Sequence, residues 1–249
     1  MGRWSRPIAA KFLDWLAMRE ELDWLDVGCG TGALSAAIME RCQPRSLIAI
    51  DPSQGFLAKA RDHVKDPRAE FQIGDAQSLP LANDSRDVVA SGLVLNFVPD
   101  RVQALSEMRR VTRPGGTVGF YVWDYPGGGV EFMRAFWQTA TALDAGAVEL
   151  TEDRRFPFCT PEGLADIAKA AGLEPLDFVA LESPSVFRDF EDYWRPFTLG
   201  AGPAPGYCAS LAPEARQRLM ERLSERLPRC ENGSIVLGTR AWACRARVD

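Results

Sequence analysis

A glycine-rich turn near the start of the chain has the residue types of a ligand-binding loop. It reads LDVGCGTG over residues 25–32, and it joins an apolar segment typical of a strand to a segment typical of a helix. Glycine lacks a Cβ, so the backbone of such a turn can approach a ligand closely, and the following helix begins with free N–H groups. We therefore expect a ligand at Gly28, Gly30 and Gly32. The alternative is a purely structural tight turn.

A carboxylate follows at the end of the next expected strand. Asp51 stands about 20 residues after the glycines, where an acidic side chain can accept both hydroxyls of a ribose. This spacing indicates a ligand that contains adenosine. It does not choose among such ligands, because Gly28, Gly30 and Ala33 also fit the looser fingerprint of NAD-binding proteins. For residues 51–53, the alternative is a plain N-terminal cap of the next helix.

The segments around these residues alternate between strand and helix patterns. Short apolar runs predict strands, and apolar residues three or four positions apart predict helices. Such alternation is typical of βα units that build a parallel sheet. The predicted strands are 22–27, 46–50, 71–73, 87–91, 117–123, 175–182 and 234–247, and the predicted helices are 33–41, 54–64, 101–111, 160–171 and 213–227. A type II turn is expected at 113–116, where a proline precedes two glycines.

Five segments, in this order, together resemble the class I S-adenosylmethionine-dependent methyltransferases of the type 11, ubiquinone/menaquinone-biosynthesis-like group. They are LDVGCGTGAL (25–34), AIDPSQGFL (49–57), GDAQSLP (74–80), DVVASGLVLNFV (87–98) and MRRVTRPGGT (108–117). The resemblance implies an α/β fold with a Rossmann-like, mostly parallel seven-stranded sheet whose last strand, 234–247, is antiparallel. It also implies S-adenosyl-L-methionine as the cofactor.

The resemblance further implies a role for each cofactor-binding residue. Gly28, Gly30 and Gly32 would pass under the methionine and ribose, and Asp51 would hold the ribose hydroxyls. The other implied neighbours of the cofactor are Asp26 at the amino group, Pro52 and Ser53 beside the adenine, Asp75 at its exocyclic amine, Ala76 at a ring nitrogen and Ser91 at the methionine end. For Asp75, the alternative is a turn aspartate that bonds its own backbone.

The N-terminal segment resembles a helix that relatives fold over the cofactor. Residues 3–16 are amphipathic, and Trp4 and Arg6 are its expected cofactor contacts. The alternative for these two residues is ordinary core packing. We therefore expect residues 1–21 to form a helical cover on a cofactor-binding core of residues 22–124, within a single methyltransferase domain that comprises residues 1–249.

Methyl transfer from a sulfonium is a direct displacement, in which positioning of the acceptor supplies much of the rate. Few catalytic residues are needed, and the residues expected to contact the acceptor are Asp124 and Tyr125, directly after the fifth strand. An exposed turn is the alternative. His63, the one histidine, is expected on the surface far from the site, because its helix carries it roughly 15 Å from the residues that follow Asp51.

An aromatic-rich block lies between the last two expected strands. Residues 188–232 contain several large aromatic side chains and one strong helix, and Phe132, Phe136 and Trp137 add to this apolar surface. Small-molecule pockets are mostly apolar, and closing attachments exclude water from them. The block predicts a lid over a small, apolar or aromatic acceptor. The alternative is that the aromatics anchor the insertion or form a dimer contact, so a homodimer stays open.

The composition argues against several other classes of protein. A net charge of −5 disfavours a nucleic-acid-binding surface, and six scattered cysteines with a single histidine disfavour a metal site. No apolar run is long enough to span a membrane, which predicts a cytoplasmic protein. The alternative functions are an NAD(P)-dependent oxidoreductase and a non-catalytic S-adenosylmethionine-binding protein.

Overall fold

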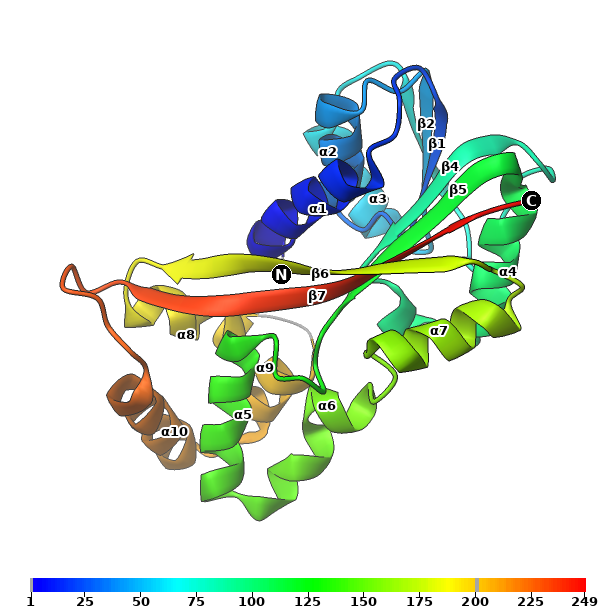
Figure 1. The fold of residues 1–249 in the computed structure, drawn as a ribbon. Helices are drawn as coiled ribbons and strands as arrows, with labels where there is room; N and C mark the ends of the chain where they lie inside the picture. Colours follow the sequence, from blue (N-terminus) through cyan, green and yellow to red (C-terminus); the bar gives the residue numbers. More distant parts are fainter. Residues whose placement is uncertain (1, 200–201) are drawn as a thin grey trace. The chain divides into compact units, whose positions relative to one another are not determined.

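The computed structural model describes residues 2–199 and 202–249 and contains a seven-stranded sheet with the strand order β3-β2-β1-β4-β5-β7-β6 (Figure 1). Neighbouring strands among β1 to β5 pair in parallel. The strands are β1 (Asp23–Val27), β2 (Ser46–Asp51), β3 (Ala69–Ile73), β4 (Arg86–Gly92), β5 (Thr112–Trp123), β6 (Leu176–Phe187) and β7 (Ile235–Arg247).

The last strand runs antiparallel to β5. The Gly115 N–H donates to the Val248 carbonyl, and the Asp124 N–H donates to the Arg240 carbonyl. Residue numbers therefore rise along β5 in the direction in which they fall along β7. The predicted α/β fold, with its mostly parallel sheet and antiparallel last strand, is confirmed.

The contacts divide the chain into two compact units. Unit 1 extends to Val122 and adds Pro161–Leu181 and Ala241–Asp249, whereas unit 2 comprises Trp123–Thr160 and Glu182–Arg240. Strands β6 and β7 contribute residues to both units. The predicted cofactor residues all belong to unit 1, and the predicted acceptor residues belong to unit 2.

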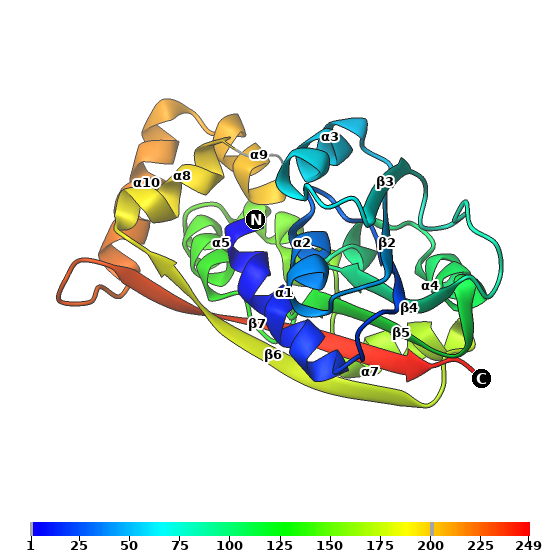
Figure 2. The ribbon, with the colours of Figure 1, turned by 90° about the horizontal axis from the view of Figure 1, so that it is seen from above.

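Unit 1 carries the helices that belong to the βα repeats, together with the N-terminal helix. They are α1 (Gly2–Leu16), α2 (Ala33–Arg41), α3 (Gln54–His63), the 3-10 turn η1 (Leu95–Phe97), α4 (Arg101–Val111) and α7 (Pro161–Ala170). The predicted bounds of α2 and α4 are confirmed. Local chemistry explains why α4 begins where it does, because the Asp100 side chain accepts a hydrogen bond from the Gln103 N–H. Helix α1 packs beside α2, as Figure 2 shows.

Residues 113–116 are predicted to form a turn outside the sheet, but in the structure they belong to strand β5. Strand β5 already begins at Thr112, and its pairing with β4 is irregular between Arg86 and Val88. Gly115 has the positive φ that the third position of a type II turn requires, yet its N–H bonds the Val248 carbonyl. The proline and glycines therefore form a bulge within β5, because Val248 lies beside them and accepts a backbone hydrogen bond from Gly115.

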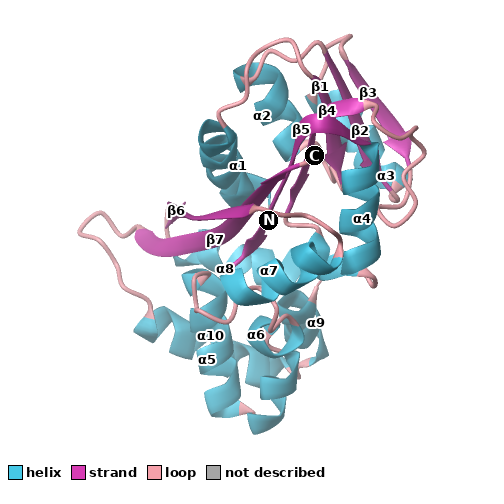
Figure 3. Ribbon diagram, turned by 45° about the vertical axis from the view of Figure 1, so that its right-hand side comes forward, coloured by secondary structure: helices cyan, strands magenta, loops and turns pink. Residues whose placement is uncertain are grey.

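Unit 2 is mainly helical, as Figure 3 shows for the chain between β6 and β7. Its helices are α5 (Glu131–Leu143), the 3-10 turn η2 (Ala145–Leu150), α6 (Glu152–Arg155), α8 (Phe190–Leu199), α9 (Pro203–Ser210) and α10 (Pro213–Arg226). Residues 200 and 201 of the predicted lid block lie outside the described residues. Helix α5 was not among the predicted elements.

The aromatic side chains of unit 2 form its core. The Phe136 ring stacks on Phe197 with 4.4 Å between the ring centroids and meets Trp137 edge-on at 5.0 Å. The Tyr193 hydroxyl is buried and donates to the Phe132 carbonyl at 2.8 Å. This packing supports an anchoring role for the aromatics of residues 188–232, and a lid role stays a proposal.

Strand β6 extends five residues beyond its predicted end. From Leu181 to Phe187 its side chains alternate between buried and exposed, as expected for a strand that packs on one face. Pro184 and two serines hide this alternation in the sequence. Proline is tolerated there because β6 is at the edge of the sheet, where one side of the backbone needs no ladder partner.

Candidate functional site

The glycine turn has the backbone conformation that its sequence predicts. Gly28, Gly30 and Gly32 have φ values of 74°, 55° and 85°, the left-handed region that glycine adopts without strain. A Cβ at Gly28 would collide with the Val94 side chain, whereas a Cβ at Gly30 would meet open space. The turn is thus closely packed at its first glycine and open at its second, where a ligand can approach the backbone.

Asp51 ties the glycine turn to the end of β2. Its carboxylate is buried and accepts hydrogen bonds from the Gly30 N–H at 2.9 Å and from the Ser53 N–H at 2.8 Å. Ser53 in turn caps α3 by accepting from the Phe56 N–H. The turn and the ribose-binding candidate are therefore brought together, as predicted, and the cap proposed as an alternative exists as well.

Asp26 is a buried carboxyl group with one unsatisfied oxygen. Its Oδ2 accepts from the Ser35 hydroxyl at 2.6 Å, while Oδ1 is buried and has no hydrogen-bond partner among the described residues. Burial raises the pKa of Asp26 to about 7, opposed by the Ser35 hydrogen bond and assisted by the charge of Asp51. An ammonium group at Oδ1 would satisfy this atom, which fits the amino group of S-adenosylmethionine.

The residues expected at the adenine lie at the carboxyl ends of β2 and β3. Asp75 is exposed, and its Oδ1 accepts from the Gln77 N–H at 2.8 Å, so it forms the turn that was its alternative role. Pro52 is exposed and Ala76 is half-buried. Large apolar side chains are exposed at Phe56 on α3, at Ile73, the last residue of β3, and at Phe97 on η1. A flat aromatic ligand could cover such surfaces.

Ser91 is buried, and its hydroxyl donates to the Val27 carbonyl at 2.9 Å. This bond joins the carboxyl ends of β4 and β1. The next residues are tightly constrained, because a Cβ at Gly92 would meet the Tyr121 hydroxyl and Leu93 has a positive φ of 63°. The contact of Ser91 with the methionine end stays a prediction.

The N-terminal helix brings Trp4 and Arg6 to different environments. Trp4 is buried, whereas Arg6 is exposed with its Nη2 2.9 Å from His63 Nε2. His63 is on the surface as predicted, but it lies near the end of the glycine turn and not far from the site as expected. It lines a hollow of about 250 Å³ together with Thr31 and Gly32. The reason is that the turn packs on α3, so a Cβ at Gly32 would lie 3.2 Å from Ala60.

Asp124 and Tyr125 are adjacent in sequence but differ in their surroundings. The Asp124 carboxylate is buried, forms an ion pair with Arg240 at 2.6 Å and accepts from the Gly127 N–H at 2.8 Å. These contacts hold the end of β5 to β7 and give Asp124 a structural role. Tyr125 lines a cavity within unit 2. Contact of either residue with the acceptor stays a prediction.

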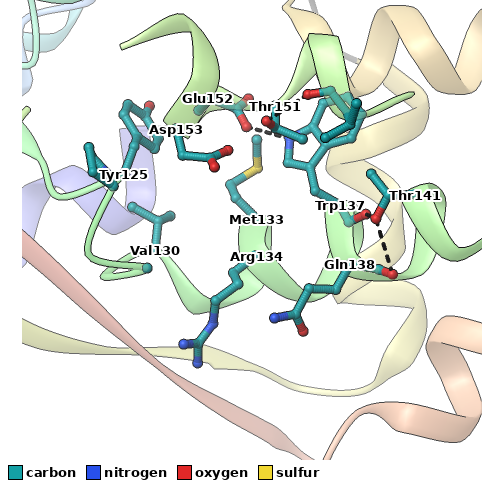
Figure 4. Close-up of a pocket in the computed structure, with 13 residues that line it drawn as sticks. Tyr125, Val130, Met133, Arg134, Trp137, Gln138, Thr141, Thr151, Glu152 and Asp153 are labelled. Atoms are coloured by element: carbon teal, nitrogen blue, oxygen red, sulfur yellow. Dashed lines mark hydrogen bonds between the residues drawn. The ribbon is translucent and has the colours of Figure 1, made fainter. Parts of the chain in front are cut away.

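The cavity in unit 2 has a volume of about 310 Å³ and combines apolar walls with carboxylates (Figure 4). Glu152, which sequence reasoning missed, is buried in its wall, and one of its oxygens accepts a hydrogen bond from the Trp137 indole. Burial raises the pKa of Glu152 to about 7, opposed first by that hydrogen bond. No spacing signal marks Glu152, because it lies in a run of charged residues on a four-residue helix.

Metal-ligand clusters and membrane-spanning helices are both absent from the described part of the chain. Within residues 2–199 and 202–249, no three His, Cys, Asp or Glu side chains are grouped as a metal ion requires. None of the helices described there has both the length and the apolar character needed to cross a lipid bilayer.

Comparison with known proteins places these features in a family. Residues 25–120 match the family model described as a methyltransferase domain. The biotin biosynthesis bifunctional protein BioHC of Cellvibrio japonicus is 37% identical over 223 residues, which are 86% of this chain and 40% of that protein. The ubiquinone/menaquinone biosynthesis C-methyltransferase UbiE of Dinoroseobacter shibae is 33% identical over 108 residues, 42% of this chain and 43% of that protein. The chain thus spans about two fifths of the length of these curated relatives.

A solved structure shares the fold at low sequence identity. Phosphoethanolamine N-methyltransferase 2 of Haemonchus contortus, in complex with S-adenosyl-L-methionine, is similar with a TM-score of 0.58 and 17% identity, covering 99% of this chain and 53% of that chain. The glycine motif left the choice between nicotinamide and S-adenosylmethionine open, and the match of residues 25–120 to a methyltransferase domain favours S-adenosylmethionine. Residues 25–120 therefore form a methyltransferase domain of the class I, type 11 group, which supports S-adenosylmethionine as the cofactor.

Proposed function

We propose that this chain transfers a methyl group from S-adenosylmethionine to a small organic acceptor with an apolar or aromatic frame. The observation that carries the proposal is the open glycine turn between two buried carboxylates, Asp26 and Asp51, inside the segment that matches a methyltransferase domain. The cofactor supplies the electrophilic methyl group. The unpaired Oδ1 of Asp26 would hold the cofactor's ammonium, and Asp51 would exchange its backbone partners for ribose hydroxyls.

We propose the cavity of unit 2 as the acceptor site. Its volume of about 310 Å³ lies at the lower end of the range for small-molecule pockets, and its walls include Tyr125, Met133 and Trp137. Such walls exclude water and orient an apolar frame. Residues 188–232 would then act as a lid by supporting these walls through Phe197 and its neighbours.

A negatively charged protein is a poor nucleic-acid binder, so we propose a free small molecule as the acceptor. A cytoplasmic location and a possible homodimer are further proposals. Cell fractionation tests the first, and size-exclusion chromatography with light scattering tests the second.

Isothermal titration calorimetry with S-adenosylmethionine, S-adenosylhomocysteine and NAD tests the cofactor assignment directly. Binding of the first two without NAD is expected, and binding of NAD alone would contradict the proposal. Release of S-adenosylhomocysteine is then measured over a panel of small acceptors, with molecules co-purified with the protein identified by mass spectrometry as the first candidates. Tight cofactor binding without turnover on any of them would favour the non-catalytic alternative.

A further inference from the structure

Glu152 is a buried acid on which the charge of Arg155 acts, but it forms no ion pair with that or any other cation among the described residues. Its side chain belongs to a residue that is 5% exposed, and its hydrogen-bond donor Trp137 is equally buried. Within the described part of the chain, the carboxylate forms no salt bridge. A buried carboxylate that lacks a counter-charge is costly in its ionised form. Its presence in the wall of a cavity therefore points to a ligand that supplies the missing positive charge.

The rest of the cavity offers further features that suit a cation. The rings of Tyr125 and Trp137 line it, and a positive charge is attracted to the faces of such rings. Asp153 adds a second carboxylate to the lining. One cation, Arg134, also lines the cavity, but its guanidinium is 3.2 Å from the Glu131 carboxylate and half-exposed, so much of its charge is already compensated by a neighbour.

We infer that this cavity binds the acceptor through a protonated amine, held by Glu152 and by the rings of Tyr125 and Trp137. The acceptor would then be a small amine with an apolar or aromatic frame, which rests on the proposed methyltransferase function. Because Glu152 is buried and Asp153 is exposed, Glu152 forms the specific contact, and Asp153 attracts the amine to the cavity entrance.

Several charged and titratable groups surround Glu152 and influence how amine binding depends on pH. Asp153 and Arg155 share its helix, Tyr125 and Cys159 lie on the flanking segments, and Arg134 lies on α5. Burial raises the pKa of Tyr125, and the charge of Glu152 adds to this shift, which places the two groups close together. A bound ammonium stabilises the ionised carboxylate, so binding near pH 6 should release a proton from Glu152.

Calorimetry with matched probes tests the inference on the full chain saturated with S-adenosylhomocysteine. The probes are phenethylamine, tryptamine and hexylamine, each compared with the alcohol and the carboxylate built on the same frame. At least one amine should bind about tenfold or more tightly than its matched alcohol, with the carboxylate weakest. Proton release near pH 6 is measured by repeating the titration in buffers of different ionisation enthalpy.

Glu152→Gln is the decisive variant, because it removes the charge and keeps the shape. It should weaken amine binding by roughly thirtyfold or more and leave alcohol binding unchanged. Glu149→Gln, an exposed acid of the preceding segment, is the matched control and should change neither. Glu152→Asp, which keeps the charge, should retain part of the preference for amines and of the proton release.

Two results would overturn the inference: no amine preferred over its alcohol in the parent protein, or an amine preference that survives Glu152→Gln. If Glu152→Gln does not fold, Glu152→Asp and the proton release of the parent protein decide the question. Failure of the inference is distinguishable from failure of the proposed function. The latter would appear as absent S-adenosylhomocysteine binding in the parent protein, whereas the former leaves that binding intact.

Discussion

Each of the two units buries one carboxyl group whose pKa is raised by burial to about 7: Asp26 in unit 1 and Glu152 in unit 2. They differ in how they are held. Asp26 is on a central strand directly before a glycine turn, with the charged Asp51 nearby, whereas Glu152 is on a short helix and is held by an indole N–H. The buried acid of unit 1 thus belongs to a local sequence motif, whereas the buried acid of unit 2 is held by an aromatic core built from residues far apart in the chain.

The two proposed ligand sites obtain their rigidity in different ways. In unit 1, the backbone N–H groups of Gly30 and Ser53 position the Asp51 carboxylate. In unit 2, the cavity depends on stacked rings such as Phe136 and Phe197. A change in the aromatic core should therefore affect the proposed acceptor site alone, and a change at the strand ends should affect the proposed cofactor site alone.

The largest expected effect comes from Phe136→Ala. This ring is fully buried and contacts Phe197, Trp137 and Tyr207, so its loss should destabilise unit 2 by about 3–5 kcal/mol. Urea denaturation measures the effect. Leu199→Ala, at a residue that is 70% exposed, is the control and should change stability by less than about 0.5 kcal/mol. S-adenosylmethionine affinity should stay within about threefold of the parent; a larger loss would break the distinction between the units.

The pH dependence of stability should show both buried carboxyls. In the folded protein without ligand they keep their protons up to about pH 7, whereas in the unfolded chain they ionise near pH 4. Between these values the folded state binds more protons, so the free energy of unfolding falls as the pH rises from about 4 to 7. For Asp26 this contribution is on the order of 4 kcal/mol.

Urea denaturation of Asp26→Asn and Glu152→Gln between pH 4 and 7 measures these contributions. Each variant should show a shallower decline than the parent. Other acids act at lower pH and in the opposite direction: hydrogen bonds from Arg45 and Arg68 lower the pKa values of Asp23 and Asp66. Their stabilisation is present above about pH 4 and is lost on further acidification. An unchanged decline in both variants would show that neither carboxyl is protonated in the folded state.

The same two variants should separate the ligand sites. Asp26→Asn should weaken S-adenosylmethionine binding by about 1.5–3 kcal/mol, because hydrogen bonds to charged groups have this strength. Glu152→Gln should leave cofactor affinity within about 0.5 kcal/mol of the parent, since its side chain belongs to unit 2. Calorimetry measures both. Equal losses in the two variants would mean that the cofactor and the acceptor share one electrostatic site.

Asp51→Ala should weaken cofactor binding by about 1–3 kcal/mol, the cost of leaving hydroxyl partners unpaired. Because Asp51 also accepts from Gly30 and Ser53, part of the loss should come from a looser glycine turn. Asp75→Ala is a useful comparison, since Asp75 is exposed and bonds Gln77, and its effect should be smaller. Unchanged affinity in well-folded Asp51→Ala would remove this residue from the site.

The smallest effect is expected for His63→Ala. The ring is exposed and contacts Arg6 near the glycine turn, but it bonds no residue of the strand ends. Methyl transfer on any acceptor that is found, and cofactor affinity, should both stay within about twofold of the parent. A loss of several hundredfold would show that the hollow between His63 and Gly32 belongs to the active site.

The features of this protein whose signals are local could be predicted from the amino-acid sequence alone. Glycines that require positive φ and strands that end in acids predict the turn at Gly28–Gly32, Asp26, Asp51 and the parallel sheet. The predicted bounds of α2 and α4 are confirmed for the same reason. These features depend on residues close together in the chain, or on a pattern repeated from one βα unit to the next.

The features that depend on residues far apart in the chain could not be predicted in this way and are known only from the folded structure. The position of His63 depends on how the glycine turn packs on α3, and Asp124 is paired with an arginine of the last strand. Glu152 becomes a buried acid only because Trp137 packs against it from another helix. Burial and pairing are set by non-local packing, and a run of charged residues carries no local signal that one of its members is withdrawn from water.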